Sequence, residues 1–330
     1  MSGFGFSAAP TPEELARFAL NDDGNAMRFI RMGGGRLLDD GTVDLSRMTV
    51  LHLRRRGWIA FNGKFWDLER GEHLARLHAI KVARAMHDQM AIKAAEMEAG
   101  GKASAKSIQA VWDFAVSAGN ASRLNNMMSV AASYLDVGME AFDADPMALN
   151  VGNGVVRLKR GPWTDGEGVE RDGPHVHFTE GHDPADRFTR ICNADYRREA
   201  PADLFAGVVK FALPRDEDRR YVQKALGYAS TGSTAEQAFF VFQGKGGDGK
   251  STIVNAAQHA LGTYATTAAI ETFLDTGTKR GSEASPDIAA LAGDTRLICA
   301  GEPPSGSKLA TGQIKQFTGG GKIKARELRE

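Results

Sequence analysis

Residues 239–252 read FFVFQGKGGDGKST, and residues 244–251 of this stretch fit the pattern GxxxxGK[ST] at every position. The apolar run that leads into it, residues 238–242, is typical of a strand buried on both faces. The residues that follow, from about 250 to 261, are typical of a helix. A strand, a glycine-rich turn and a helix in this order predict a phosphate-binding loop in an α/β fold.

Each position of this loop has a physical role in binding a nucleoside triphosphate. Glycines let the backbone turn tightly and bring its N–H groups to the phosphates, and the dipole of the following helix favours the same anion. The predicted phosphate-binding residues are Gly244, Lys245, Gly246, Gly247, Asp248, Gly249, Lys250, Ser251 and Thr252. Lys250 is expected to reach the β- and γ-phosphates during catalysis, and Ser251 to bind Mg²⁺. The predicted cofactors are therefore ATP and Mg²⁺.

An ATP-hydrolysing site also needs an acidic residue at the end of a neighbouring strand. Residues 296–300 (RLICA) are a second candidate for a buried strand, and Glu302 follows it. We predict that Glu302 is a catalytic acid that holds Mg²⁺ and polarises the attacking water; the alternative is that it only ends a strand. Asp294 is the other acid nearby, but it precedes the strand and would lie at the wrong edge of the sheet.

The composition limits the class of protein. The chain has 330 residues, 42% of them hydrophobic and 25% charged, with a formal net charge of zero. This length suffices for two domains, and nucleic-acid binding would need a local basic surface. Cys192 and Cys299 form no CxxC pattern, which argues against a disulfide framework or zinc site and favours the cytoplasm. No signal peptide or membrane-spanning run of about 18 apolar residues is indicated.

The rest of the chain is organised around helix caps and turns. Thr11 and Pro12 predict a helix start, and Asn62-Gly63 predicts a hairpin turn within residues 57–68. Further predictions are helices over about 71–98, 107–135 with a stop at 119–120, and 219–228; a strand pair around 152–154; and an exposed connection over 159–186. We place the domain boundary near residue 200.

Two weaker signals each have a structural and a functional interpretation. His175, His177 and nearby His182 are typical of a polar loop with scattered histidines, and less often of a metal site. The aromatic residues of the hairpin are expected to fill a small core and, less often, to stack on bases; they are Trp58, Phe61, Phe65 and Trp66.

The end of the chain is basic. Residues 308–330 contain six basic and two acidic residues, and residues 318–322 (TGGGK) would make a flexible basic turn. Such a turn fits contact with a DNA backbone, which responds mainly to charge, or is a solvated surface turn.

Several segments in order resemble a known family, the superfamily III helicase core of phage and plasmid primase-helicases, which is related to the poxvirus D5-type primase-helicase. FFVFQGKGGDGKST matches its motif A, TRLICAGE its motif B, and IKQFTGGGKIKAR the motif after B; LGTYA also fits. YVQKALGYASTG resembles the helical lead-in to that core. The segments that resemble the preceding domain of these proteins are LNDDGNAMRFI, GWIAFNGKFW and FDADPMALNVGNGVVRL.

The resemblance implies an AAA+-like P-loop ATPase domain over residues 201–330, preceded by a mainly helical α+β accessory domain over residues 1–200. It implies a homo-hexameric ring that translocates on single-stranded or forked DNA, with a primase or another replication partner, in the host cytoplasm of a phage or prophage. Lys250 and Ser251 then bind phosphate and Mg²⁺, Glu302 is the motif B acid, and Lys322 and Lys324 contact DNA.

This chain departs from the family pattern in two ways. Gly321 stands where the family commonly has an acid, and Glu330 ends the sequence before the family's sensor asparagine and arginine finger. No acidic or zinc pattern of a primase precedes the helicase part, so we expect a truncated product or a fragment. The predicted function is a DNA-stimulated ATPase and helicase. The alternatives are a truncated remnant that binds ATP without catalysis, and another P-loop phosphotransferase such as a small-molecule kinase.

Overall fold

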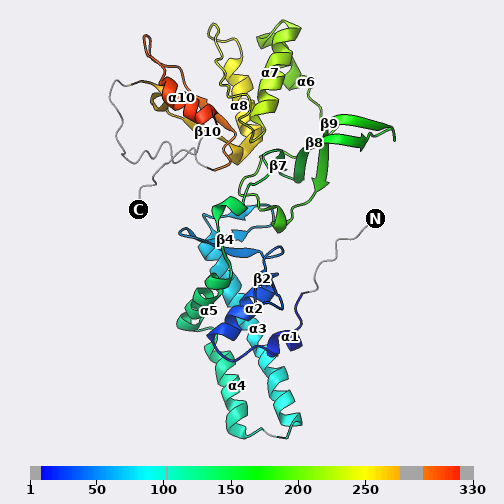
Figure 1. Ribbon diagram of the computed structural model, residues 1–330, viewed down its shortest axis with the longest axis vertical. Helices are drawn as coiled ribbons and strands as arrows, with labels where there is room; N and C mark the ends of the chain where they lie inside the picture. Colours follow the sequence, from blue (N-terminus) through cyan, green and yellow to red (C-terminus); the bar gives the residue numbers. More distant parts are fainter. Residues whose placement is uncertain (1–8, 102, 276–292, 320–330) are drawn as a thin grey trace. The chain divides into compact units, whose positions relative to one another are not determined.

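The computed structural model describes residues 9–101, 103–275 and 293–319 of the chain (Figure 1). These residues form a mixed α/β structure that divides into two compact units. Unit 1 comprises Met1–Phe142 with Asp183–Thr189, and unit 2 comprises Asp143–His182 with Arg190–Glu330. The domain boundary that the sequence suggests, near residue 200, falls within unit 2 and stays a prediction.

The helices of unit 1 begin where the sequence supplies caps. Thr11 accepts a hydrogen bond from the backbone N–H of Glu14 and starts the first helix, and Asn21 caps the second in the same way from Gly24. The cap of the fourth helix is Ser104, which bonds reciprocally with Ser107. The helices are α1 (Pro12–Ala16), α2 (Asp22–Met32), α3 (Gly71–Ala99), α4 (Ala105–Ser117) and α5 (Ala121–Tyr134).

A small sheet completes unit 1, with the strand order β5-β4-β3-β6. Its strands are β3 (Val50–Leu53), β4 (Gly57–Phe61), β5 (Trp66–Asp67) and β6 (Asp136–Val137); β1 (Arg36–Leu37) pairs separately with β2 (Val43–Asp44). The predicted hairpin is confirmed as the antiparallel pair β4–β5. Its turn is held by the side chain of Asn62, which accepts from the N–H groups of Lys64 and Phe65, and Gly63 has a φ of +100°.

The core of unit 1 contains Trp58 and Trp66 of that hairpin, and the partly buried Phe61 packs against it. Trp58 is 7% exposed and Trp66 is 1% exposed, and both pack in one cluster with residues from α2, α3 and α5. Their burial supports the core interpretation over base stacking. Arg28 is also fully buried in this unit, and its guanidinium donates to the oxygens of Gln89, Phe18 and Ala19.

Unit 2 contains two sheets and a set of helices. One sheet has the order β7-β8-β9 and the other is the parallel pair β10-β11. The strands are β7 (Ala148–Val151), β8 (Gly154–Thr164), β9 (Glu170–Glu180), β10 (Ala265–Ala268) and β11 (Leu297–Ala300); the helices are α6 (Asp203–Ala212), α7 (Asp216–Ala229), α8 (Lys250–Leu261) and α10 (Thr311–Thr318). Among the helices of the described ranges, none combines the length and apolarity that crossing a membrane requires.

One sequence prediction is wrong in its larger part: residues 159–186 are mostly not a loose connection. Residues 159–164 continue β8, and β9 pairs with it along its full length, which gives the long hairpin that stands out in Figure 1. Four of the glycines and prolines that indicated a loop, namely Gly161, Pro162, Gly173 and Pro174, are paired within the hairpin. Gly161 lies opposite Gly173, and both have a positive φ, +139° and +136°, which side chains other than glycine rarely adopt.

A second prediction is also wrong: residues 238–242 form no strand in the structure. Their side chains are exposed, with Phe239 at 53% and Val241 at 76%. The apolar composition predicted burial between two neighbouring strands, but in the described part of the chain no strand pairs with this segment. The predicted strand at 296–300 is confirmed as β11, although none of its residues is fully buried: Leu297, Ile298 and Cys299 are half-buried and Ala300 is exposed.

Candidate phosphate-binding site

The glycine-rich loop of unit 2 leads directly into α8, which begins at Lys250 and ends at Leu261 as the sequence indicates. Gly249 precedes the helix with a φ of +85°, and Gly247 has a φ of +78°. These conformations strongly favour glycine, and they turn the exposed loop onto the amino end of the helix. The N–H of Lys250, at the start of the helix, donates to Oδ1 of Asp248 at 3.4 Å. The amino end of a helix favours an anion, and here the carboxylate of Asp248 takes that place.

The side chain of Lys250 folds back over this loop. Its ammonium lies 2.6 Å from Oδ1 of Asp248, donates also to Oδ2 of that carboxylate, and donates to the carbonyl oxygen of Lys245 at 3.2 Å. The hydrogen bond from Lys250 holds the pKa of the Asp248 carboxyl below its usual range, although partial burial acts in the opposite direction. The loop thus holds an ammonium group in contact with an anion.

Close packing around the loop explains two of its glycines. A side chain at Gly244 would collide with the carboxylate of Asp248 and with the ammonium of Lys250. A Cβ at Gly249 would lie 3.1 Å from the Cβ of Ala212, because the end of α6 lies against the start of α8. Gly244 and Gly249 are therefore the two glycines of the loop at which an added side chain would meet close neighbours.

The helix α8 is held against the parallel strand pair. It contacts both β10 and β11, and Ile253 on its first turns is 1% exposed. β10 and β11 pair in register from Ala265–Leu297 to Ala268–Ala300, so their carboxyl ends lie at the same edge.

Glu302 follows β11 by two residues at that edge, and its side chain is exposed. Ser251 and Thr252 are exposed on the first turn of α8. Within the ranges that the structure describes, no hydrogen bond or ion pair joins Glu302 to Lys250 or Ser251. The structure therefore brings Lys250 together with Asp248 and Lys245, and it does not bring Glu302 into that group.

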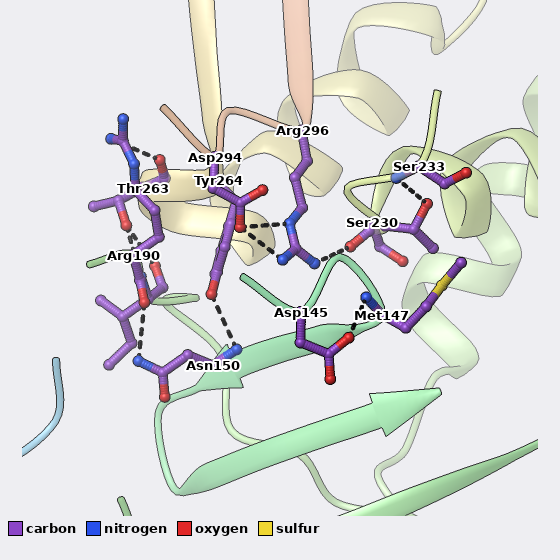
Figure 2. Close-up of polar contacts among 12 residues, drawn as sticks. Asp145, Met147, Asn150, Arg190, Ser230, Ser233, Thr263, Tyr264, Asp294 and Arg296 are labelled. Carbon is purple, nitrogen blue, oxygen red and sulfur yellow. Dashed lines mark hydrogen bonds and ion pairs between the residues drawn. The ribbon is translucent and has the colours of Figure 1, made fainter. Parts of the chain in front are cut away.

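A buried polar cluster lies at the opposite edge of β10 and β11, where both strands begin (Figure 2). The guanidinium of Arg296 donates to Oδ2 of Asp294 at 2.7 and 3.0 Å and to the carbonyl of Ser230 at 3.0 Å. It lies 4.5 Å from the ring centroid of Tyr264, whose hydroxyl accepts from the N–H of Asn150 at 3.2 Å. These contacts join β7, α7, β10 and β11 within unit 2.

This cluster was not identified from the sequence as a unit. The only signal was an acid followed two residues later by an arginine at the start of a strand. Asp294 lies before β11 and is engaged by Arg296, so it stands apart from the loop of residues 244–251. The partnership of Asp248 with Lys250 was also missed, although the two residues lie in the same motif.

Other predicted site residues are placed as follows. Lys322 and Lys324 lie outside the described residues. His175 and His177 lie on β9, and His182 follows it; no group of three or more His, Cys, Asp or Glu side chains among the described residues is arranged to hold a metal ion. Cys192 is a buried free thiol, and burial raises its pKa to about 12.

Comparison with known proteins identifies the family. A protein of Acanthamoeba polyphaga mimivirus that is named a putative helicase is 32% identical to this chain over 122 residues, which is 37% of this chain and 12% of the mimivirus protein. The chain thus spans a small part of that relative's length. The family described as D5 N terminal like matches residues 41–214, which is more than half of the 330 residues. The chain therefore belongs to the D5 N terminal like family.

Proposed function

We propose that this chain is an ATP-binding and ATP-hydrolysing part of a DNA helicase of the primase-helicase type, within superfamily III. The observation that carries the proposal is the position of Lys250, whose ammonium lies over a glycine-rich turn at the amino end of α8. The family membership and the helicase name of the mimivirus relative support the same proposal. A P-loop alone would leave the class of nucleotide-dependent reaction open.

The loop residues have distinct tasks in this proposal. Lys250 binds the β- and γ-phosphates in place of the Asp248 carboxylate, and the N–H groups of the first turn of α8 bind the same anion. Mg²⁺ takes only one or two ligands from a protein and the others from phosphates and water. The exposed hydroxyl of Ser251 and the exposed carboxylate of Glu302 fit that limited role. Bound Mg²⁺ would neutralise charge on the transferred phosphoryl group.

The assembly and the partners follow from the same proposal. The chain acts on single-stranded or forked DNA, assembles as a homo-hexamer with ATP between subunits, and works beside a primase or another replication partner in the cytoplasm of the host cell. Light scattering with and without ATP and Mg²⁺ tests the assembly. A mass that corresponds to a single chain under both conditions would contradict the hexamer.

The experiment that tests the function is steady-state ATP hydrolysis by the full chain, with and without single-stranded DNA. Lys250→Ala is the informative variant, and Lys224→Ala is its control because it removes an exposed lysine of the same unit that lies outside the loop. Loss of a charge-assisted contact should weaken nucleotide binding by about ten- to a hundredfold. We expect turnover that rises with DNA, disappears in Lys250→Ala and persists in Lys224→Ala. Turnover that ignores DNA would favour another P-loop phosphotransferase.

A second candidate function is binding of ATP without turnover. Two observations favour it: residues 238–242 are exposed and unpaired in the described structure, and Glu302 makes no described contact with the loop. Under this alternative a fluorescent ATP analogue binds and Lys250→Ala weakens its binding to the same extent, but no phosphate is released with or without DNA. Failure of the analogue to bind to the folded chain would contradict both candidates.

A further inference from the structure

The long hairpin β8–β9 has two faces of different chemistry. Its strands pair one to one from Gly154 opposite Glu180 to Thr164 opposite Glu170. Because successive side chains alternate along a strand, residues 157, 159 and 163 share a face with their neighbours 171, 175 and 177 on the partner strand. We call this the basic face, and its residues are Arg157, Lys159, Trp163, Arg171, His175 and His177.

An independent contact places the two strands' side chains on the same side. The rings of Trp163 and His175 stack with their centroids 5.5 Å apart and their planes 17° apart. These residues are separated along the ribbon by the Gly161–Gly173 pair. Because neither glycine carries a side chain, the indole can lie over the imidazole across the gap, which builds a flat aromatic platform on the basic face.

The two faces of the hairpin differ in the sign of their charged side chains. The basic face contains three cations and two histidines, and no acidic side chain of the paired strands lies on it. The opposite face carries Arg160 together with the acids Asp172 and Glu170. In a hairpin that only faces solvent, we expect basic and acidic side chains on both faces. The absence of acidic side chains from the basic face therefore indicates a surface that binds an anion.

The positive groups of the basic face lie close enough to affect one another. Burial, and then the positive charges of Lys159, Arg157 and His175, lower the pKa of His177. Arg171 is partly neutralised by an ion pair with Asp165 in the turn. Lys159 is exposed, and no acidic partner is found for it within the described residues. The positive potential is therefore concentrated on the part of the face around Lys159.

We propose that the basic face of the β8–β9 hairpin binds single-stranded DNA. Lys159 and Arg157 attract the phosphates, and Trp163, supported by His175, offers a surface on which an unpaired base stacks. Bases in a duplex are already stacked on each other, so the aromatic platform selects the single strand. The inference rests on the proposed function for the choice of DNA, and it assigns contact to a segment apart from the phosphate loop.

The test is the binding of a fluorescently labelled oligothymidylate to the full chain, followed by anisotropy at several salt concentrations. Lys159→Ala removes a cation from the basic face, and Arg160→Ala is the matched control on the opposite face of the same strand. We expect Lys159→Ala to weaken binding several-fold at low salt. It should also reduce the slope of log affinity against log salt by about 0.7, the value for one phosphate contact on a single strand. Arg160→Ala should stay within about twofold of the parent.

Trp163→Leu tests the stacking platform while it keeps an apolar side chain in the ribbon. We expect a loss of affinity on the order of tenfold with an almost unchanged salt slope, because stacking depends little on counterions. Circular dichroism of each variant checks that the fold is retained. Equal losses in Lys159→Ala and Arg160→Ala, duplex binding as tight as single-strand binding, or a parent chain that binds no DNA would each overturn the proposal.

Nucleotide binding measured on the same preparations separates this inference from the proposed function. If the parent binds an ATP analogue and DNA but Lys159→Ala binds DNA like the parent, the hairpin inference fails alone. If the parent binds no nucleotide while Lys159→Ala and Trp163→Leu still lose DNA, the ATPase proposal fails and the hairpin inference stands.

Discussion

The ammonium of Lys250 donates two hydrogen bonds to the carboxylate of Asp248, which lies two residues earlier in the same loop. The lysine side chain is 28% exposed and the aspartate side chain 32% exposed. An anion of the protein thus lies against the ammonium that is proposed to bind the anionic phosphates. A nucleotide that binds there has to replace this contact, which makes Asp248 a competitor of the ligand.

The first prediction concerns Asp248→Asn. Since a partly exposed ion pair contributes about 0–1 kcal/mol, its removal should tighten the binding of an ATP analogue by up to roughly fivefold. Fluorescence titration in the presence of Mg²⁺ measures the affinity, and Asp275→Asn, outside the loop in the same unit, serves as the control. Weaker binding by Asp248→Asn would show that the carboxylate helps the ligand instead of competing with it.

The second prediction concerns the cluster at the start of β10 and β11. The side chain of Arg296 is 1% exposed, and Arg296→Met would leave the 13% exposed carboxylate of Asp294 without its partner. Breaking a buried ion pair costs roughly 3–5 kcal/mol, so unit 2 should lose that much stability. Hydrogen exchange at the amides of β10 and β11 reports this unit separately from unit 1.

The double variant Arg296→Met with Asp294→Asn is the companion test. It removes the unpaired charge as well, so it should regain part of the stability that Arg296→Met loses. If the losses in the free energy of unfolding of Arg296→Met and Asp294→Asn simply add up in the double variant, the two side chains are not coupled.

A third prediction concerns pH and unit 1. His78 on α3 is half-buried, its Nε2 lies 2.9 Å from the carbonyl oxygen of Phe29, and burial lowers its pKa below the ordinary value of 6.5. The hydrogen bond with Phe29 acts in the opposite direction and Lys81 lowers the pKa further. The unfolded chain therefore takes up a proton before the folded chain does, so stability is lost as the pH falls from about 6.5 through the folded pKa.

Urea unfolding of the full chain at pH 7.5 and at pH 5.5, followed by tryptophan fluorescence, measures this effect. His78→Gln should show a smaller loss of stability between the two pH values than the parent. His73 is exposed on the same helix, and His73→Gln should keep the pH dependence of the parent. The prediction is wrong if His78→Gln and the parent lose the same stability on acidification.

The features that could be predicted from the sequence are those that depend on neighbouring residues, such as helix caps and turns. Thr11 caps α1, Asn62 and Gly63 make the hairpin turn, and the glycines before Lys250 start α8, because each of these effects acts over a few residues. The β8–β9 hairpin was missed for the opposite reason. Gly161 and Gly173 indicate a loop locally, and only their pairing across the ribbon makes them parts of strands.

In the candidate site, too, the local features were predictable and those that depend on the rest of the fold were not. The GxxxxGK[ST] pattern predicted the glycine conformations and the helix start, which depend on adjacent residues. The apolar run at 238–242 predicted burial, but burial of a strand needs neighbouring strands, and those are set by the rest of the fold. The position of Glu302 relative to Lys250 is likewise a tertiary property, since each lies at the end of a different element.

The last prediction therefore addresses Glu302 directly. If Glu302 positions Mg²⁺ and the attacking water, Glu302→Gln should bind an ATP analogue like the parent and hydrolyse ATP about a hundred- to ten-thousandfold more slowly. The amide keeps the size of the side chain and removes its negative charge, so binding and turnover should separate. Glu199→Gln, an exposed glutamate of the same unit, should leave both unchanged. Normal hydrolysis by Glu302→Gln would show that Glu302 has no catalytic role and only follows β11 in the chain, because a carboxylate that turnover does not need cannot position the metal or the water.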